Sequence, residues 1–228
     1  MKKKLLTVIL AVVLTFGCVA GLIACGNDGE GAPDPEKIKS EKVADAEAWA
    51  KAFDFSEVDN ATVKLNDGDS HGIFFIESNK IYQESTIQIE DKVNGTVETE
   101  SEKAYFVKDN DGKVFAYIYN EEQDKYEKES YGHEQFNVQS LVGEYFGLCK
   151  DFSSFEFDEE KGAYVSSGEE KNDAHYEIQV KITNGKVCFM NYSYKFTLNS
   201  EIREGSEGFQ IYNIGKTTVT LPDDLPQE

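Results

Sequence analysis

The chain has 228 residues, with 43 acidic and 23 basic side chains and a formal net charge of −20 at pH 7. Nucleic acid is excluded as a partner, because binding to phosphates requires a basic surface. Anionic lipid headgroups should also repel a body of this charge. The length is sufficient for one domain with its own hydrophobic core.

The N-terminal residues have the layout of an export signal. Three lysines follow Met1, and residues 5–24 contain no charged side chain. A basic start before an apolar stretch is typical of a secretory signal, although about 20 apolar residues would also span a bilayer as a helix. Residues 22–25, LIAC, resemble the lipobox of bacterial prolipoproteins, and a polar stretch follows. The resemblance implies that Cys25 receives a diacylglycerol and becomes the first residue after cleavage.

A lipid on Cys25 would hold the chain on the extracytoplasmic face of the bacterial cell membrane. Two acyl chains anchor stably, because each buried CH₂ contributes about 0.8 kcal/mol. Residues 26–39, GNDGEGAPDPEKIK, are rich in Gly, Pro and charge, which predicts a disordered tether. The three lysines leave with the signal, so the charge of the mature chain falls from −20 to about −23. The predicted parts are a signal peptide (1–24), a lipidated tether (25–39) and one domain (40–228).

Two segments of the domain have the apolar spacing of amphipathic helices. The first covers about residues 40–53, with Ser40 as the candidate N-cap, and the second covers residues 138–149, with Asn137 as the candidate N-cap. The apolar positions are Val43, Ala46, Trp49, Ala50 and Phe53 in the first segment, and Val138, Leu141, Val142, Tyr145, Phe146 and Cys149 in the second.

From about residue 61 the apolar period changes to two, which indicates β-strands. Asn-Gly or Asn-Asp-Gly sequences at 66–68, 94–95, 110–112 and 184–185 predict tight hairpins, since these residues accept positive φ. Residues 176–182 alternate between apolar and polar, as expected of a strand with one buried and one solvent-facing side. After the next turn, the aromatic residues at 192, 194 and 196 continue the register of Cys188 and Met190.

Such runs predict roughly ten or eleven strands, connected mostly as hairpins. A sheet of this size should curl, and the apolar stripes of the helices must be buried against it. The predicted fold class is therefore α+β: a long curled antiparallel β-meander, half-barrel-like, with two helices packed on one face.

The order of these elements resembles the LolA/LppX-like lipoproteins. The shared features are a lipobox, a short tether, a helix, a long antiparallel meander with a second helix inserted midway, and a closing strand, here residues 212–222, that ends in Pro222. The resemblance covers about residues 40–222. It implies a half-barrel whose concave face is covered by helices and whose apolar interior carries lipids or lipoproteins. No ligand-binding motif of that family is matched residue by residue.

No set of residues indicates catalysis, a metal or a cofactor. His71, His133 and His175 are not spaced as a helical metal pair, and no nucleophile elbow, phosphate loop or dinucleotide fingerprint is present. Calcium loops starting at Asp67 or Asp109 would lack ligands at the required positions, so both segments are interpreted as hairpin turns. We therefore expect a protein that is not an enzyme and needs no cofactor.

Cys149 and Cys188 are the cysteines that remain after the signal and the lipidated residue are set aside. In an oxidising compartment they could form one disulfide. They could equally be two buried thiols that pack as small hydrophobic side chains, and we favour the thiols.

Two functions follow from these patterns. The first is a binding or carrier module for an apolar ligand, a lipid or a hydrophobic small molecule, held in a groove between the sheet and the helices. The groove would be lined by Trp49, Phe53, Leu141, Tyr145 and Phe146. The alternative is a module with a solid core that contacts another envelope protein through its acidic surface. A cavity on the order of 300–1,000 Å³ between sheet and helices favours the carrier, and a filled interior favours the alternative.

Overall fold

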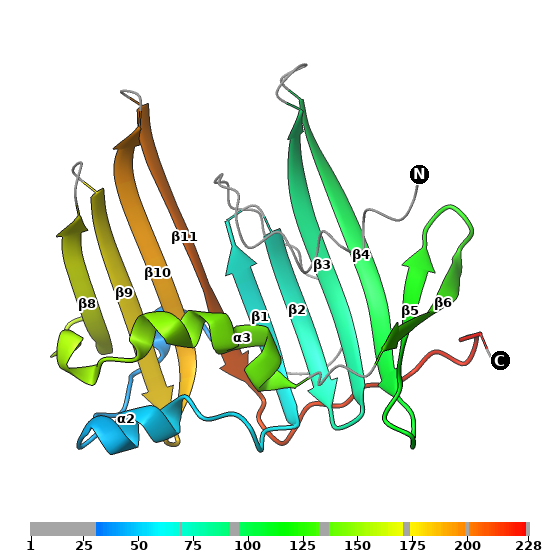
Figure 1. Ribbon diagram of the computed structural model, residues 1–228, viewed down its shortest axis with the longest axis horizontal. Helices are drawn as coiled ribbons and strands as arrows, with labels where there is room; N and C mark the ends of the chain where they lie inside the picture. Colours follow the sequence, from blue (N-terminus) through cyan, green and yellow to red (C-terminus); the bar gives the residue numbers. More distant parts are fainter. Residues whose placement is uncertain are drawn as a thin grey trace.

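The computed structural model describes residues 31–68, 70–91, 96–132, 137–170, 174–198 and 201–226. These residues form one open antiparallel sheet of 11 strands, with two α-helices lying across it (Figure 1). The predicted fold class, a curled α+β meander with two helices, is confirmed. Cys25 and the turn at 94–95 lie outside the described residues. Within the described ranges, no helix is long and apolar enough to cross a membrane.

The strands form two consecutive meanders. The first contains β1 (Asn60–Asp67), β2 (Ser70–Glu77), β3 (Lys80–Asp91), β4 (Thr96–Lys108), β5 (Val114–Asn120) and β6 (Lys125–Gly132). The second contains β7 (Glu156–Asp158), β8 (Ala163–Glu170), β9 (Ala174–Thr183), β10 (Lys186–Leu198) and β11 (Glu201–Tyr212). The helices are α2 (Ala46–Ala52) and α3 (Val138–Phe146), and short 3₁₀ turns occupy η1 (Pro35–Lys37), η2 (Gly147–Cys149) and η3 (Phe152–Ser154).

The two meanders are joined side by side through β1 and β11. The strand order is β6-β5-β4-β3-β2-β1-β11-β10-β9-β8-β7. In the joining pair, Thr62 lies opposite Tyr212 and Asp67 lies opposite Glu207. This pairing brings together the two ends of the domain and closes a long loop of chain. The entropy cost of closing that loop is larger than for a hairpin, because the cost rises with loop length.

The turn between β9 and β10 has the conformation that its sequence predicts. Asn184 and Gly185 have φ of 53° and 69°, as a two-residue hairpin turn requires. The Glu41 carboxylate fixes this turn from outside, because it accepts hydrogen bonds from Asn184 N at 2.7 Å and Gly185 N at 3.1 Å. Hairpins also form at 66–68 and 110–112, as predicted.

Helix α2 begins later than predicted, and Ser40 is not its cap. The Ser40 hydroxyl accepts a hydrogen bond from Ile182 N at 2.9 Å, at the end of β9. Asp45 is the N-cap, since its carboxylate accepts from Ala48 N at 2.9 Å. A carboxylate satisfies an unpaired N–H and also complements the positive end of the helix.

Helix α3 begins where predicted. The Asn137 side chain accepts from Ser140 N at 2.9 Å, and the Ser140 hydroxyl accepts from Asn137 N at 3.0 Å, which forms a capping box. The α-helix ends at Phe146, and residues 147–149 continue it as a 3₁₀ turn.

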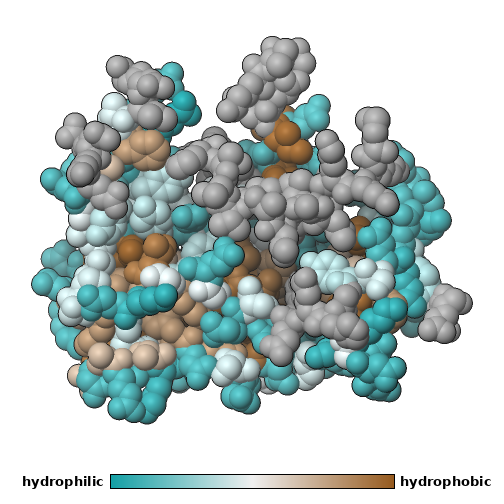
Figure 2. Space-filling view, in the orientation of Figure 1, coloured by the Kyte–Doolittle hydropathy of each residue, from teal (hydrophilic) through white to brown (hydrophobic). Residues whose placement is uncertain are grey.

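Both helices pack on the same side of the sheet, which we call the helix face (Figure 1). Trp49 of α2 meets Tyr164 of β8 edge to face, with ring centroids 5.0 Å apart. Tyr145 of α3 meets Phe209 of β11 at 5.7 Å. Apolar side chains on this side gather around α2 and α3 at the lower left of Figure 2. The core therefore lies between the helices and the sheet.

Residues 33–38 lie on the opposite side of the sheet, the outer face. The Lys181 ammonium donates to the carbonyls of Pro35 at 2.8 Å and Ile38 at 2.9 Å, and the Gln210 amide donates to the Pro33 carbonyl at 2.6 Å. The prediction of disorder is therefore wrong for this end of the tether. Because the segment covers it, Lys181, predicted to face solvent, is only 4% exposed.

The segment after β11 also lies on the outer face. Thr217 pairs with the side chain of Asn60, donating from its N at 2.8 Å and accepting at its O at 2.8 Å, and its hydroxyl lies 3.0 Å from that of Thr62. Val219 N donates to Glu77 at 2.7 Å. The predicted closing strand at 212–222 is therefore wrong beyond Tyr212, where β11 ends and side-chain hydrogen bonds replace strand pairing.

The sheet divides into two leaves at one end. The β1–β11 register ends at Asp67 opposite Glu207, and the β2–β3 register ends at Ser70 opposite Ile87. Beyond these rungs, β11 stays paired with β10 and β3 stays paired with β4 (Figure 1). We call this interruption the notch. Residues 201–206 of β11 border it on one side, and residues 88–91 of β3 border it on the other.

Candidate functional site

The residues predicted to line a ligand groove come together on the helix face. Trp49 is 2% exposed, and its indole N–H donates to the Cys149 carbonyl at 2.7 Å. Four rings surround the indole at centroid distances of 5.0 to 5.3 Å, those of Phe53, Phe152, Phe155 and Tyr164.

The rings of α3 fill the neighbouring space. Phe146 contacts Phe53 at 5.2 Å, Phe55 at 5.9 Å and Phe209 at 5.9 Å. Leu141 and Tyr145 are half-buried and pack against the same core. The predicted groove residues therefore touch each other and the sheet. Side chains occupy the space in which the apolar ligand was expected.

The two remaining cysteines are free thiols, and both are buried. Cys149 lies at the end of η2, beside Trp49 on the helix face. Cys188 lies at a β-bulge, where the register with β9 shifts between Val187 and Phe189, and its sulfur bonds the Lys181 carbonyl at 3.4 Å. The bulge takes Cys188 out of the predicted register with Met190. The alternative of a disulfide is thus not realised. Burial raises the pKa of the Cys149 thiol to about 12, so it is not an activated nucleophile.

Among the described residues, no group of three or more His, Cys, Asp and Glu side chains is placed to hold a metal ion. His133 lies outside the described ranges, and His175 is 56% exposed on β9.

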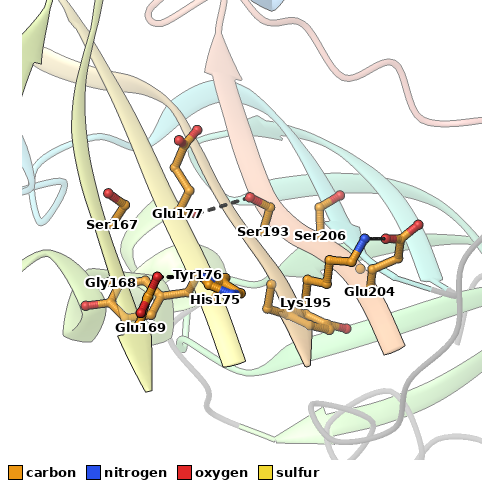
Figure 3. A pocket seen from close by; sticks show the side chains of 12 residues that line it. Ser167, Gly168, Glu169, His175, Tyr176, Glu177, Ser193, Lys195, Glu204 and Ser206 are labelled. Atoms are coloured by element: carbon orange, nitrogen blue, oxygen red, sulfur yellow. Dashed lines mark hydrogen bonds and ion pairs between the residues drawn. The ribbon is translucent and has the colours of Figure 1, made fainter. Parts of the chain in front are cut away.

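A shallow hollow of about 690 Å³ opens on the outer face of β8–β11 (Figure 3). One of its walls is a cross-strand row of three serines around Glu177. The other is a row of charged side chains two residues further along each strand. The first row is Ser167, Glu177, Ser193 and Ser206, and the second is Glu169, His175, Lys195 and Glu204. The short serine side chains leave the space between the rows open.

The charges of the hollow are matched in pairs. Lys161 binds both oxygens of Glu177 at 2.7 Å, and Gln179 donates to the same carboxylate at 2.6 Å. The hydrogen bond from Lys161 lowers the pKa of Glu177 and keeps it ionised. In the second row, Lys195 pairs with Glu204 at 3.1 Å and His175 lies 3.5 Å from Glu169. The hollow offers hydroxyls and fixed hydrogen-bond acceptors for polar contacts.

A carboxyl pair lies at the base of the notch. Burial, together with a hydrogen bond to Asp67 and its charge, raises the pKa of Glu207 to about 7. The same two carboxylates face Tyr145 of α3, whose pKa is raised mainly by burial. Two carboxyls opposite each other on adjacent strands hold a proton near neutral pH, because both cannot ionise without repulsion.

Sequence reasoning missed both the hollow and the carboxyl pair. The hollow depends on the register of four consecutive strands, β8 to β11. The carboxyl pair joins β1 to β11, which are distant in sequence, and carboxylates are too frequent in this chain for spacing to single out a pair. One sequence pattern could have indicated the hollow: a serine lies two residues from a charged residue, and so on the same face of the strand, at Ser193 and Lys195 and at Ser167 and Glu169.

No family model, no curated protein and no solved structure matches the chain. The resemblance to LolA/LppX-like lipoproteins therefore stays a prediction.

Proposed function

We propose that the chain is an extracytoplasmic lipoprotein, anchored through Cys25, and that it works as a non-enzymatic interaction module with a solid core and an acidic surface. The observation that carries this proposal is the filled helix face. Rings from both helices and from the sheet contact one another at 5.0 to 5.9 Å where a carrier would need an open groove.

Residues 33–38 are held on the sheet, and this shortens the tether between the proposed lipid and the domain. Only residues 25–32 remain between the proposed lipid and the first residue held on the sheet, Pro33. Eight residues span at most about 29 Å fully extended, and about 16 Å on average as a flexible coil. A partner within this reach is another component of the envelope.

The charge of the chain favours a partner with a basic surface. At about −23 once the three signal lysines of the −20 chain are removed, the mature chain attracts cationic proteins over a distance and repels anionic ones. Such steering raises association rates and weakens as ionic strength rises.

Two measurements on the mature sequence separate the module from the carrier. Native mass spectrometry should give the mass of the chain without a copurified lipid. Trp49 is the single tryptophan, so its emission reports the helix face directly. We expect no change in that emission when a fatty acid is added. A bound lipid, or a saturable change in Trp49 emission, would show that the helices open and that the chain is a carrier.

The anchor is tested in cells with a palmitate analogue. Wild-type chain and a Cys18→Ser variant should both be labelled and sediment with membranes. A Cys25→Ser variant should remain unlabelled. Labelling that persists in the Cys25→Ser variant would refute the anchor while leaving the fold intact.

A further inference from the structure

We propose that the hollow on the outer face of β8–β11 binds a neutral, hydroxyl-rich ligand, namely a short chain of uncharged sugar units. This site adds a second kind of ligand to the protein partner proposed above, and its chemistry does not depend on the anchor at Cys25. The proposal is carried by the shape of the hollow, by the side chains that line it and by the way in which their charges are already matched.

The hollow has the dimensions of a site for a chain of a few linked units. It crosses four neighbouring strands, β8 to β11, so its walls run over three strand spacings, about 14 Å. Its volume of about 690 Å³ lies within the range of small-molecule sites, on the order of 300–1,000 Å³. A long, shallow trough suits a chain that lies along it better than a compact ligand that must be enclosed.

The floor of the hollow consists of backbone. One residue from each strand forms it, namely Gly168, Tyr176, Tyr194 and Gly205. Successive side chains of a strand point to opposite faces, so the two tyrosine rings lie on the helix face. There Tyr176 packs against Gly168 and Tyr194 packs against Gly205, where a Cβ would otherwise stand. The rings therefore support the floor from behind and leave a flat strip of peptide groups facing the ligand.

The walls offer hydrogen-bond donors and acceptors together. The serine row provides three hydroxyls and one carboxylate, those of Ser167, Ser193, Ser206 and Glu177 (Figure 3). One row further along the same face, the amides of Gln179 and Asn191 lie opposite each other. A hydroxyl both donates and accepts, and an amide side chain does the same through its two ends. The walls can therefore satisfy a ligand whose surface is made of hydroxyls.

The charges of the hollow disfavour an ionic ligand. Lys161 holds the Glu177 carboxylate at 2.7 Å. Lys195 holds the Glu204 carboxylate at 3.1 Å. A cationic ligand would have to displace an ammonium that is already in place. The third carboxylate, Glu169, is 80% exposed, and an ion pair at such a position adds little. An anionic ligand would be repelled by all three carboxylates.

A neutral polar ligand avoids both costs. It can use the remaining lone pairs of the carboxylates without breaking an ion pair. An apolar ligand would instead remove water from the hydroxyls and charged groups of the walls without replacing their hydrogen bonds. A polymeric glycan of the cell envelope and a free oligosaccharide share the required chemistry, and the proposed anchor would place the hollow among envelope glycans.

The test uses the isotope-labelled mature chain and the neutral trisaccharides cellotriose, maltotriose and triacetylchitotriose. NMR titration gives the affinity, and the amide shifts locate the contact. We expect at least one trisaccharide to bind with a Kd on the order of 1 mM, because polar contacts that replace water add little net free energy. The shifts should centre on residues 167–169, 175–177, 193–195 and 204–206, while Trp49 emission stays unchanged. Glucose, which makes fewer contacts, should bind at least about tenfold more weakly.

Matched ligands test the charge argument. Chitotriose without its acetyl groups has the same chain with an ammonium on each unit, and trigalacturonic acid has a carboxylate on each unit. Both should bind the hollow more weakly than the neutral trisaccharides. The affinity of the neutral trisaccharides should not change with ionic strength, because no ion pair forms. Cosedimentation with insoluble chitin or cellulose then separates the two sources: capture assigns a polymeric glycan, and binding in solution alone assigns a free oligosaccharide.

Two variants with the same substitution locate the site independently. Ser193→Leu fills the middle of the hollow with hydrocarbon and removes a hydroxyl, so it should weaken binding at least about tenfold. Ser101→Leu makes the same change at an exposed residue of β4 and should leave binding unchanged. Far-UV circular dichroism shows that each variant is folded, and Ser206→Leu, on the neighbouring strand, repeats the test if Ser193→Leu does not fold.

Several results would overturn the proposal: no binding of any neutral trisaccharide, shifts centred away from the hollow, or equal weakening by Ser101→Leu and Ser193→Leu. Tighter binding of the ammonium trimer, lost as ionic strength rises, would also overturn it and would assign the hollow to a basic segment of a protein. None of these results bears on the filled helix face or on the lipid at Cys25, which the Trp49 and palmitate measurements decide separately.

Discussion

Replacing Trp49 by Phe tests whether the helix face is a packed core. The indole is 2% exposed and donates its N–H to the Cys149 carbonyl at 2.7 Å. Phe fills most of the same space but has no donor, so the carbonyl is left buried without its partner at a cost of about 1–3 kcal/mol. The missing part of the indole leaves a small cavity among the four neighbouring rings, which adds about 1 kcal/mol at about 24 cal/mol per Å³. We expect a loss of about 2–4 kcal/mol in the free energy of unfolding.

Urea denaturation followed by far-UV circular dichroism measures this loss, since the variant has no tryptophan to report by fluorescence. The free energy of unfolding of a single domain is about 5–15 kcal/mol, so the expected loss is a large fraction of it. Leu148→Ala is the matched control, because Leu148 precedes Cys149 but is 44% exposed, and it should cost less than about 1 kcal/mol. A loss below about 1 kcal/mol for Trp49→Phe would mean that the indole lines an open groove, and the carrier would then be the better proposal.

Three further changes test other parts of the structure. A Cβ on Gly208 would lie 2.1 Å from the Met190 carbonyl oxygen, so Gly208→Ala should cost about 3 kcal/mol or prevent folding, whereas Gly147→Ala, with no atom within 4 Å, should be neutral or slightly stabilising in the same urea titration. Asn137→Ala removes the capping box of α3 and should lower the free energy of unfolding by about 1 kcal/mol, and no loss would show that the cap is dispensable. The pKa of Glu207 is raised, so wild type loses stability as the pH rises from the ordinary glutamate range through about 7. Glu207→Gln should therefore melt at a higher temperature than wild type at about pH 8 and at the same temperature at about pH 5, and a difference that does not change with pH would refute the carboxyl pair.

Local patterns predicted the elements that local physics determines. The cap at Asn137 and the hairpin at 184–185 were both found from sequence, because each depends on interactions within a few residues. The start of α2 was missed because the segment contains two residues able to cap a helix, Ser40 and Asp45. Only the tertiary contact of Ser40 with Ile182 N decides between them.

Contacts between distant segments account for the rest. Composition correctly marks residues 26–39 as poor in apolar side chains, but it cannot show that Lys181 will hold two of their carbonyls on the sheet. Nor does the alternation of β10 reveal the bulge that moves Cys188 out of register. The carboxyl pair depends wholly on such contacts, because only the pairing of β1 with β11 places Asp67 opposite Glu207.

The position of the tether relates the proposed anchor to the notch. The chain reaches the sheet at Pro33, held by Gln210 near one end of β11, while Glu201 begins the same strand about 30 Å away. The tether is therefore attached at the opposite end of β11 from the notch. Anionic headgroups repel the carboxylates that border the notch, and this repulsion acts within about a Debye length of the surface, about 8–10 Å. The end of the domain held closest to the membrane should thus be the Gln210 end.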